Sequence, residues 1–156
     1  MKINGRVPSG PNIVTLVLPR AEGEPFVFRA KAVTDYSKFE KFCPDPEPPK
    51  VNKRGQGWSE DYDDAGYKKA AAERTTNQYH WMVLESLSAT EGLEWEHVKH
   101  DDPSTWKQWE SELREAGFSR FELGRLHNAV RQANCLDDNM VEAARESFFA
   151  NQSPGL

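Results

Sequence analysis

Two short runs of β-branched and aromatic residues stand near the start of the chain. Residues 13–18 read IVTLVL and residues 26–33 read FVFRAKAV, with a glycine-containing turn between them. Two such runs around a short loop predict an antiparallel β-hairpin. Side chains alternate between the two faces of a strand, so Phe26, Phe28 and Ala30 share one face. Because an isolated hairpin is marginally stable in water, we expect this face to rest on the helices later in the chain or on another chain.

Apolar residues at helical spacing predict helices along the rest of the chain. Residues 35–42 suffice for two turns, and residues 67–88 form the longest candidate because Ala and straight-chain residues fill their first half. Three further helices are predicted in the C-terminal third. They begin at Asp102, which precedes a proline, at Ser119, which opens a capping box, and at Asp137, which can act as an N-cap. The short links between them predict a small helical cluster.

The periodic pattern is lost between the first helix and the longest one. The stretch CPDPEPPK contains four prolines, which remove backbone donors and favour an extended polyproline conformation. The residues after it are polar and contain glycine, which predicts a flexible loop. The fold class predicted is α+β, with an N-terminal β-hairpin or small sheet followed by a mainly α-helical domain of four to five helices. The predicted division is a hairpin segment with a short helix over 1–42, a proline-rich spacer and flexible loop over 43–66, a helical domain over 67–150 and a tail over 151–156.

Length, charge and cysteine content limit the classes of function. The 156 residues are 37% hydrophobic, which suits one domain with a modest core. The net charge of -5, from 25 acidic and 20 basic residues, argues against nucleic acid as a partner, because nucleic-acid binders carry a basic face. Cys43 and Cys135 are too far apart in sequence for a zinc or redox motif, which predicts two free thiols. Without a signal-peptide pattern or an apolar run of about 20 residues, neither export nor a membrane partner is expected.

The candidates for catalytic or metal-binding chemistry are isolated. His97, His100 and Asp101 offer two imidazoles and a carboxylate, but a structural zinc site needs four close ligands and the cysteines are far off in sequence. His80 and His127 lie in predicted helices without a serine or cysteine nucleophile motif. The sequence therefore predicts a protein that is not an enzyme and that has no metal site and no cofactor.

The aromatic residues have two interpretations. Five tryptophans and four tyrosines can form a core, since large aromatic side chains close small domains efficiently. Alternatively, aromatic residues in the polar loop lie away from the helical stripes and can bind a partner protein. The last helix adds apolar residues on one stripe. The partner-binding residues predicted in this way are Trp58, Tyr62, Tyr67, Met140 and Phe148.

Four stretches of the chain resemble one protein family. They are the hairpin end FRAKAV, the segment DYSKFEKFCPDPEPP, the helix NQYHWMVLESL that leads to LEWEHV, and the C-terminal region GFSRFELGRLHNAVRQANCLDDNMVEAARESF. In their order along the chain they resemble the tail assembly chaperones of tailed bacteriophages. The resemblance implies a non-enzymatic protein of the host cytoplasm that coats the tape-measure protein while tail tube subunits assemble around it. The sequence does not decide whether the chain forms a homo-oligomer, or whether ribosomal frameshifting makes a longer product.

Two other classes of function compete with this one. The chain can be a structural component of the virion, such as a tail or head-to-tail connector protein, whose hairpin adds strands to its neighbours. It can also be a small enzyme or an inhibitor of a host enzyme. An enzyme would require a pocket in which His97, His100 and Asp101 converge.

Overall fold

The chain opens with the antiparallel β-hairpin that its alternating apolar residues predict. In the computed structural model, which describes residues 1–152, strand β1 (Ile13–Leu18) pairs with strand β2 (Phe26–Lys31). Phe28 and Ala30, on the predicted inward face, are buried. The hairpin is therefore confirmed, and its predicted inward face is buried at Phe28 and Ala30 but not at Phe26, which is 52% exposed.

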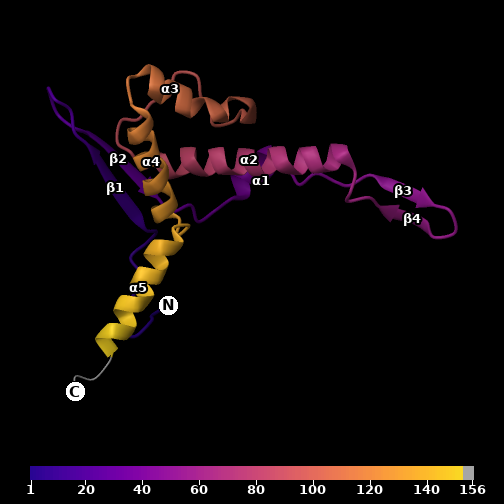
Figure 1. Ribbon diagram of the computed structural model, residues 1–156, viewed down its shortest axis with the longest axis horizontal. Helices are drawn as coiled ribbons and strands as arrows, with labels where there is room; N and C mark the ends of the chain where they lie inside the picture. The colour runs from indigo at the N-terminus through magenta and orange to yellow at the C-terminus, as the bar shows by residue number, and fades with distance from the viewer. Residues whose placement is uncertain (153–156) are drawn as a thin grey trace. The chain divides into compact units, whose positions relative to one another are not determined.

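Helices make up most of the chain after the hairpin. Five α-helices are described there, which confirms the α+β class with a mainly helical second part. Figure 1 labels the elements after the hairpin, which are helix α1 (Ser37–Phe42), strands β3 (Lys50–Lys53) and β4 (Gly57–Glu60), helix α2 (Ala65–Leu87), the 3-10 helix η1 (Pro103–Gln108), and helices α3 (Trp109–Glu115), α4 (Arg120–Ala133) and α5 (Asp138–Gln152).

The described chain divides into two compact units, each built from separate segments. Unit 1 contains residues 1–34, residues 85–94 and the described residues from Leu113 onward. Unit 2 contains residues 35–84 and 95–112. This division differs from the one drawn from the sequence, because the hairpin shares a unit with the C-terminal helices rather than forming a segment of its own.

In unit 1, helix α4 packs across the inward face of the hairpin and contacts both strands. Its apolar residues recur at helical spacing and form a single buried stripe. The hairpin therefore rests on a helix, as its marginal stability in isolation requires. The buried residues of α4 are Leu123, Leu126, Ala129, Val130 and Ala133.

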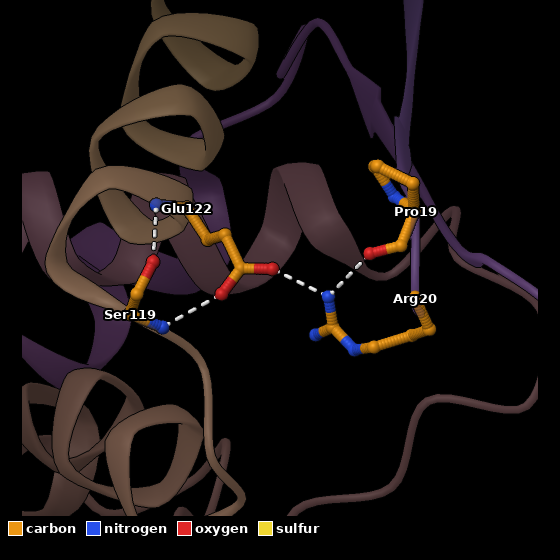
Figure 2. A network of polar contacts seen from close by, with 4 residues as sticks. All are labelled: Pro19, Arg20, Ser119 and Glu122. Carbon is orange, nitrogen blue, oxygen red and sulfur yellow. Dashed lines mark hydrogen bonds and ion pairs between the residues drawn. The ribbon is translucent and has the colours of Figure 1, made fainter. Parts of the chain in front are cut away.

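A polar network around Arg20 joins the end of β1 to the start of α4. The Arg20 guanidinium forms an ion pair with the Glu122 carboxylate and donates a hydrogen bond to the Pro19 carbonyl, at 2.9 Å (Figure 2). Ser119 and Glu122 form the predicted capping box: the Glu122 N–H donates to Ser119 Oγ at 3.2 Å, and the Ser119 N–H donates to Glu122 Oε2 at 2.7 Å. The bond from Ser119, followed by the one from Arg20, holds the pKa of Glu122 below its ordinary value.

The same guanidinium lies between two aromatic rings. Its central carbon is 5.0 Å from the centre of the Phe26 ring and 4.7 Å from that of Phe118. Phe118 also makes edge-to-face contacts with Phe26 and Phe28, with ring centres 5.4 and 5.6 Å apart. The link after β1 is therefore held to α4 by an ion pair, cation–π contacts and aromatic packing together.

Unit 2 is built around buried indole rings, so the core interpretation holds for most of the tryptophans. Trp81, Trp106 and Trp109 are buried. Phe39 of α1 contacts both Trp81 and Trp106, with ring centres 5.9 and 6.2 Å away. The Trp109 Nε1–H donates to His80 Nδ1 at 3.1 Å, so the polar atom of this buried indole has a partner.

The prediction of a flexible loop over residues 51–66 is wrong for most of that segment. Strands β3 and β4 form a second antiparallel hairpin there, and α2 begins at Ala65. Gly55 and Gly57 adopt positive φ angles of 83° and 73°, which lets the chain reverse between the strands. Because neither strand buries a side chain fully, the hairpin leaves no alternating apolar pattern in the sequence.

The proline-rich stretch lies wholly within unit 2 and is fastened to α2. Arg74 of α2 donates from Nε to the Cys43 carbonyl at 2.9 Å, and its guanidinium pairs with Asp45 at 3.0 Å. Residues 44–49 have no regular secondary structure, as their prolines predict. They do not separate the N-terminal hairpin from a helical domain, since both ends of the stretch belong to the same unit.

The C-terminal elements differ from the prediction in two details. Asp102 caps the first of them as expected, with its Oδ1 accepting from the Ser104 N–H at 3.0 Å, but the first six helical residues form the 3-10 helix η1. A 3-10 helix superimposes residues three apart, which directs Trp106 and Trp109 into the same core. Of the predicted tail over 151–156, the first two residues belong to α5 and the other four lie outside the described residues.

Helix α4 ends in a Schellman motif whose left-handed residue is Cys135. The Leu136 N–H donates to the Arg131 carbonyl at 2.8 Å, and the Cys135 N–H donates to the Gln132 carbonyl at 3.1 Å. Cys135 has a φ of 59°, a conformation in which a residue with a Cβ is strained and for which glycine is the usual choice. Both cysteines are free thiols, as predicted.

Removing the Arg20 side chain should weaken the attachment of the hairpin to α4. We expect Arg20→Ala to lower the free energy of unfolding by about 1 to 2 kcal/mol, because it removes a cation from two rings and breaks an ion pair. Chemical denaturation followed by circular dichroism measures the change. The matched control is Arg125→Ala on the exposed side of α4, which should change stability by less than about 0.5 kcal/mol. Equal effects of the two substitutions would contradict the role of Arg20.

Relieving the strain at Cys135 should stabilise unit 1. We expect Cys135→Gly to raise the free energy of unfolding by about 1 kcal/mol, because glycine adopts the left-handed conformation without steric cost. Cys135→Ala removes the thiol but keeps the Cβ, and its stability should stay close to that of the natural chain. A gain in both variants would show that the thiol, not the backbone conformation, limits stability.

Candidate protein-binding surfaces

Helix α5 is the element of unit 1 that buries least. Asp137 precedes it and caps it as predicted, since its side chain accepts a hydrogen bond from the Met140 N–H at 3.3 Å. None of its residues is buried, and Met140 and Phe148 are 47% and 57% exposed. A soluble helix normally buries one stripe, and an isolated helix of this length is marginal in water. Within the described residues, α5 therefore has no buried stripe to stabilise it.

The exposed apolar residues of α5 form a stripe. Helical geometry places Met140, Val141, Ala144 and Phe148 within about one third of the circumference. Phe149 lies about 80° further round the helix, beyond Arg145, and packs edge-to-face on Phe148, with ring centres 5.4 Å apart. We call residues 140, 141, 144, 148 and 149 the α5 stripe. A contiguous exposed apolar surface of this kind is typical of a protein-binding site.

Unit 2 carries the predicted aromatic residues of the segment between β4 and α2. The rings of Tyr62 and Tyr67 meet edge-to-face with centres 5.7 Å apart. The Tyr62 hydroxyl donates to Glu60 Oε2 at 2.6 Å, and this bond raises the pKa of Tyr62. The Tyr67 N–H donates to Asp64 Oδ2 at 2.8 Å at the start of α2. These contacts hold the tyrosine pair at the junction between β4 and α2.

Trp58 lies apart from the tyrosine pair. It stands on β4 opposite Asn52 and is 71% exposed, more than any other tryptophan described. Within residues 1–152 no aromatic ring packs against Trp58, whereas Tyr62 and Tyr67 touch each other. Of the five predicted residues, the structure thus brings Tyr62 and Tyr67 into contact and places Met140 and Phe148 on the α5 stripe, whereas Trp58 stands by itself on β4.

The residues considered for metal binding do not form a site. Among the described residues, no group of three His, Cys, Asp or Glu side chains is placed to hold a metal ion. The segment with His97 is instead organised by Glu112, whose carboxylate accepts hydrogen bonds from the N–H groups of Glu96, His97 and Val98 at 2.6 to 2.8 Å. This carboxylate therefore holds an irregular backbone segment in place.

Burial raises the pKa of the Cys43 thiol, which lowers the reactivity of that thiol.

The sequence prediction missed a second apolar surface in unit 1. Ile13, Val17 and Val27 lie on the outward face of the N-terminal hairpin and are 53%, 52% and 45% exposed. The run IVTLVL contained the signal, because a strand with apolar residues on both faces is typical of one covered on both sides. Phe149 was also missed, since it lies beside the predicted helical stripe.

The described residues contain no helix with both the length and the apolar character needed to cross a bilayer. Comparisons with protein-family models, with curated protein sequences and with solved structures found no match to this chain. The surfaces themselves are therefore the basis for assigning a function.

Deleting α5 should leave the rest of the protein folded. We expect a chain that ends at Leu136 to keep its melting temperature within about 3 °C, because α5 buries no residue. Leu126→Ala provides the contrast: this side chain is 2% exposed, and its truncation should cost about 2 to 5 kcal/mol. Thermal unfolding followed by circular dichroism distinguishes the two. A loss of cooperative unfolding in the shortened chain would show that α5 is part of the fold.

Proposed function

We propose that this chain is a tail assembly chaperone of tailed bacteriophages, which binds the tape-measure protein in the host cytoplasm during tail assembly and catalyses no reaction. The observation that carries the proposal is the α5 stripe, an exposed apolar surface on a helix that buries nothing of its own. The choice of the tape-measure protein as partner rests on the four stretches that resemble this family, among them the C-terminal region that contains α5.

The chemistry of α5 suits a helical partner. Apolar side chains at positions i, i+4 and i+8, here Met140, Ala144 and Phe148, are the anchors by which an amphipathic helix lies in an apolar groove. Burying Met140 and Phe148 would contribute about 1.5 to 3 kcal/mol each. The small side chain of Ala144 between them permits a close approach of the two helices. A long helical protein that exposes apolar stripes before it is enclosed in the tail tube fits this surface.

The tyrosine pair and Trp58 supply a second contact in the proposal. Aromatic side chains that combine an apolar ring with a polar edge are frequent at the centres of protein interfaces. Tyr62, Tyr67 and Trp58 belong to unit 2 and the α5 stripe to unit 1. We assign the α5 stripe to the tape-measure protein, and we propose Trp58 and the tyrosine pair as the contact for tail tube subunits.

Co-expression with the tape-measure protein of the same phage tests the proposal. We expect the natural chain to keep the tape-measure protein in the soluble fraction and to be captured with it. Met140→Glu and Phe148→Glu should each abolish capture, because they place a charge in the apolar contact. Asn139→Glu adds the same charge on the opposite side of α5 and should bind as the natural chain does.

Two results would contradict the proposal. One is a tape-measure protein that stays equally soluble without this chain, and the other is capture that survives both Met140→Glu and Phe148→Glu. Quantitative mass spectrometry of purified particles gives an independent check, since a chaperone is absent from the finished virion. Stoichiometric amounts in the particle would favour the alternative function, a structural protein of the tail or of the head-to-tail connector.

A further inference from the structure

The two edges of the N-terminal hairpin differ in how far the rest of unit 1 covers them. Side chains from outside the hairpin cover the outer edge of β2. The Thr90 hydroxyl bonds both the N–H and the C=O of Arg29, at 2.9 and 3.1 Å, and the Ser86 hydroxyl donates to the Lys31 carbonyl at 2.8 Å. This edge therefore has little capacity to pair with another strand.

These bonds also establish which backbone groups of β1 point outward. Arg29 and Lys31 direct their polar groups away from β1, so their opposite residues Thr15 and Ile13 direct theirs away from β2. The hydrogen bond from the Ala32 N–H to the Asn12 carbonyl, at 2.8 Å, agrees with this alternation. The N–H and C=O groups of Ile13, Thr15 and Val17 thus form the outer edge of β1. Within residues 1–152 no hydrogen bond to this edge is recorded.

The β1 edge also lacks the features by which proteins protect an exposed edge. Such edges usually carry a lysine, a proline or a bulge, whereas IVTLVL contains no charge and no proline. Its six residues all pair regularly with β2, so the strand is not interrupted by a bulge. An uncharged, regular and open edge is a template for a further strand.

We propose that β1 pairs with β1 of a second copy of this chain, in antiparallel orientation about a two-fold axis at Thr15. The outward groups of Thr15 then bond those of Thr15 in the second copy, and Ile13 lies opposite Val17 of the second copy. Two hairpins become one four-stranded antiparallel sheet. Because the β1 edge carries no charge, it does not favour a charged partner strand. Two copies of the edge can pair without like-charge repulsion.

The inward face of β1 supports the choice of a second copy. Val14 and Leu16 point to the side on which α4 packs, yet both are only half-buried, while Leu18 on the same face is buried. Pairing about Thr15 sets Val14 beside Leu16 of the second copy, so the two incompletely covered side chains cover each other. On the outward face, the exposed Val17 then lies between Val27 of its own hairpin and Ile13 of the second copy. The dimer therefore buries apolar side chains on both faces of the new sheet.

A charge swap at Thr15 tests this arrangement in the full-length protein. Thr15 is exposed, so lysine or glutamate there should leave the hairpin intact, as circular dichroism and the melting temperature verify. By sedimentation velocity, the natural chain should be a dimer. Thr15→Lys and Thr15→Glu should each raise the dimer dissociation constant at least tenfold, because each places like charges directly opposite across the axis. An equimolar mixture of the two variants should dimerise again.

Hydrogen exchange locates the contact. In the natural dimer the amides of Ile13, Thr15 and Val17 should be protected, and they should lose this protection in Thr15→Lys. A monomeric natural chain, a dimer that survives both Thr15 variants, or a mixture that stays monomeric would overturn the proposal. Phe148→Glu should dimerise normally, because the pairing does not involve α5. Loss of the dimer in Phe148→Glu, with the Thr15 variants intact, would instead place the self-contact on α5.

Discussion

The burial of the hairpin's apolar face beneath α4 is the contact on which unit 1 depends. Two strands alone bury too little apolar surface to be stable in water, and a single amphipathic helix has the same difficulty. Each supplies the surface that the other lacks, and the Arg20 network fastens them where β1 ends and α4 begins. Because these elements come from opposite ends of the chain, their contact also sets the division into units.

Once this core is formed, two exposed surfaces of unit 1 are left outside it. The α5 stripe follows directly after the Schellman motif at the end of α4, and the β1 edge lies on the side of the hairpin to which no hydrogen bond from residues 1–152 is recorded. They differ in their chemistry: the stripe offers side chains to a helix, whereas the edge offers backbone donors and acceptors to a strand. The two surfaces are therefore suited to different kinds of partner.

In both units, single polar side chains bond backbone groups that helices and strands leave without a partner. Glu112 accepts three consecutive backbone N–H groups, and Thr90 bonds both polar groups of Arg29. Buried or crowded backbone groups must find partners, and where no helix or strand provides them a carboxylate or hydroxyl does. Periodicity does not identify such residues, because a hydrogen bond from one side chain to a distant backbone group leaves no repeat in the sequence. His97 illustrates the result, because its position reflects a backbone bond to Glu112 rather than a ligand set.

The sequence alone determined the elements whose signals are local. The alternation in FVFRAKAV, the capping box at Ser119 and the N-caps at Asp102 and Asp137 each act through neighbouring residues, and all four were confirmed. The exposed α5 stripe was predicted as a pattern, but periodicity does not tell whether an apolar stripe meets a core or solvent. Tertiary contacts decided that point, as they decided the bare edge of β1. The β3–β4 hairpin and the contact of Tyr62 with Tyr67 are local, but neither strand buries a side chain fully, so the sequence shows no alternating apolar pattern there. The exposure of α5 and of the β1 edge depends on which distant segments pack together, and such contacts are not visible in local periodicity.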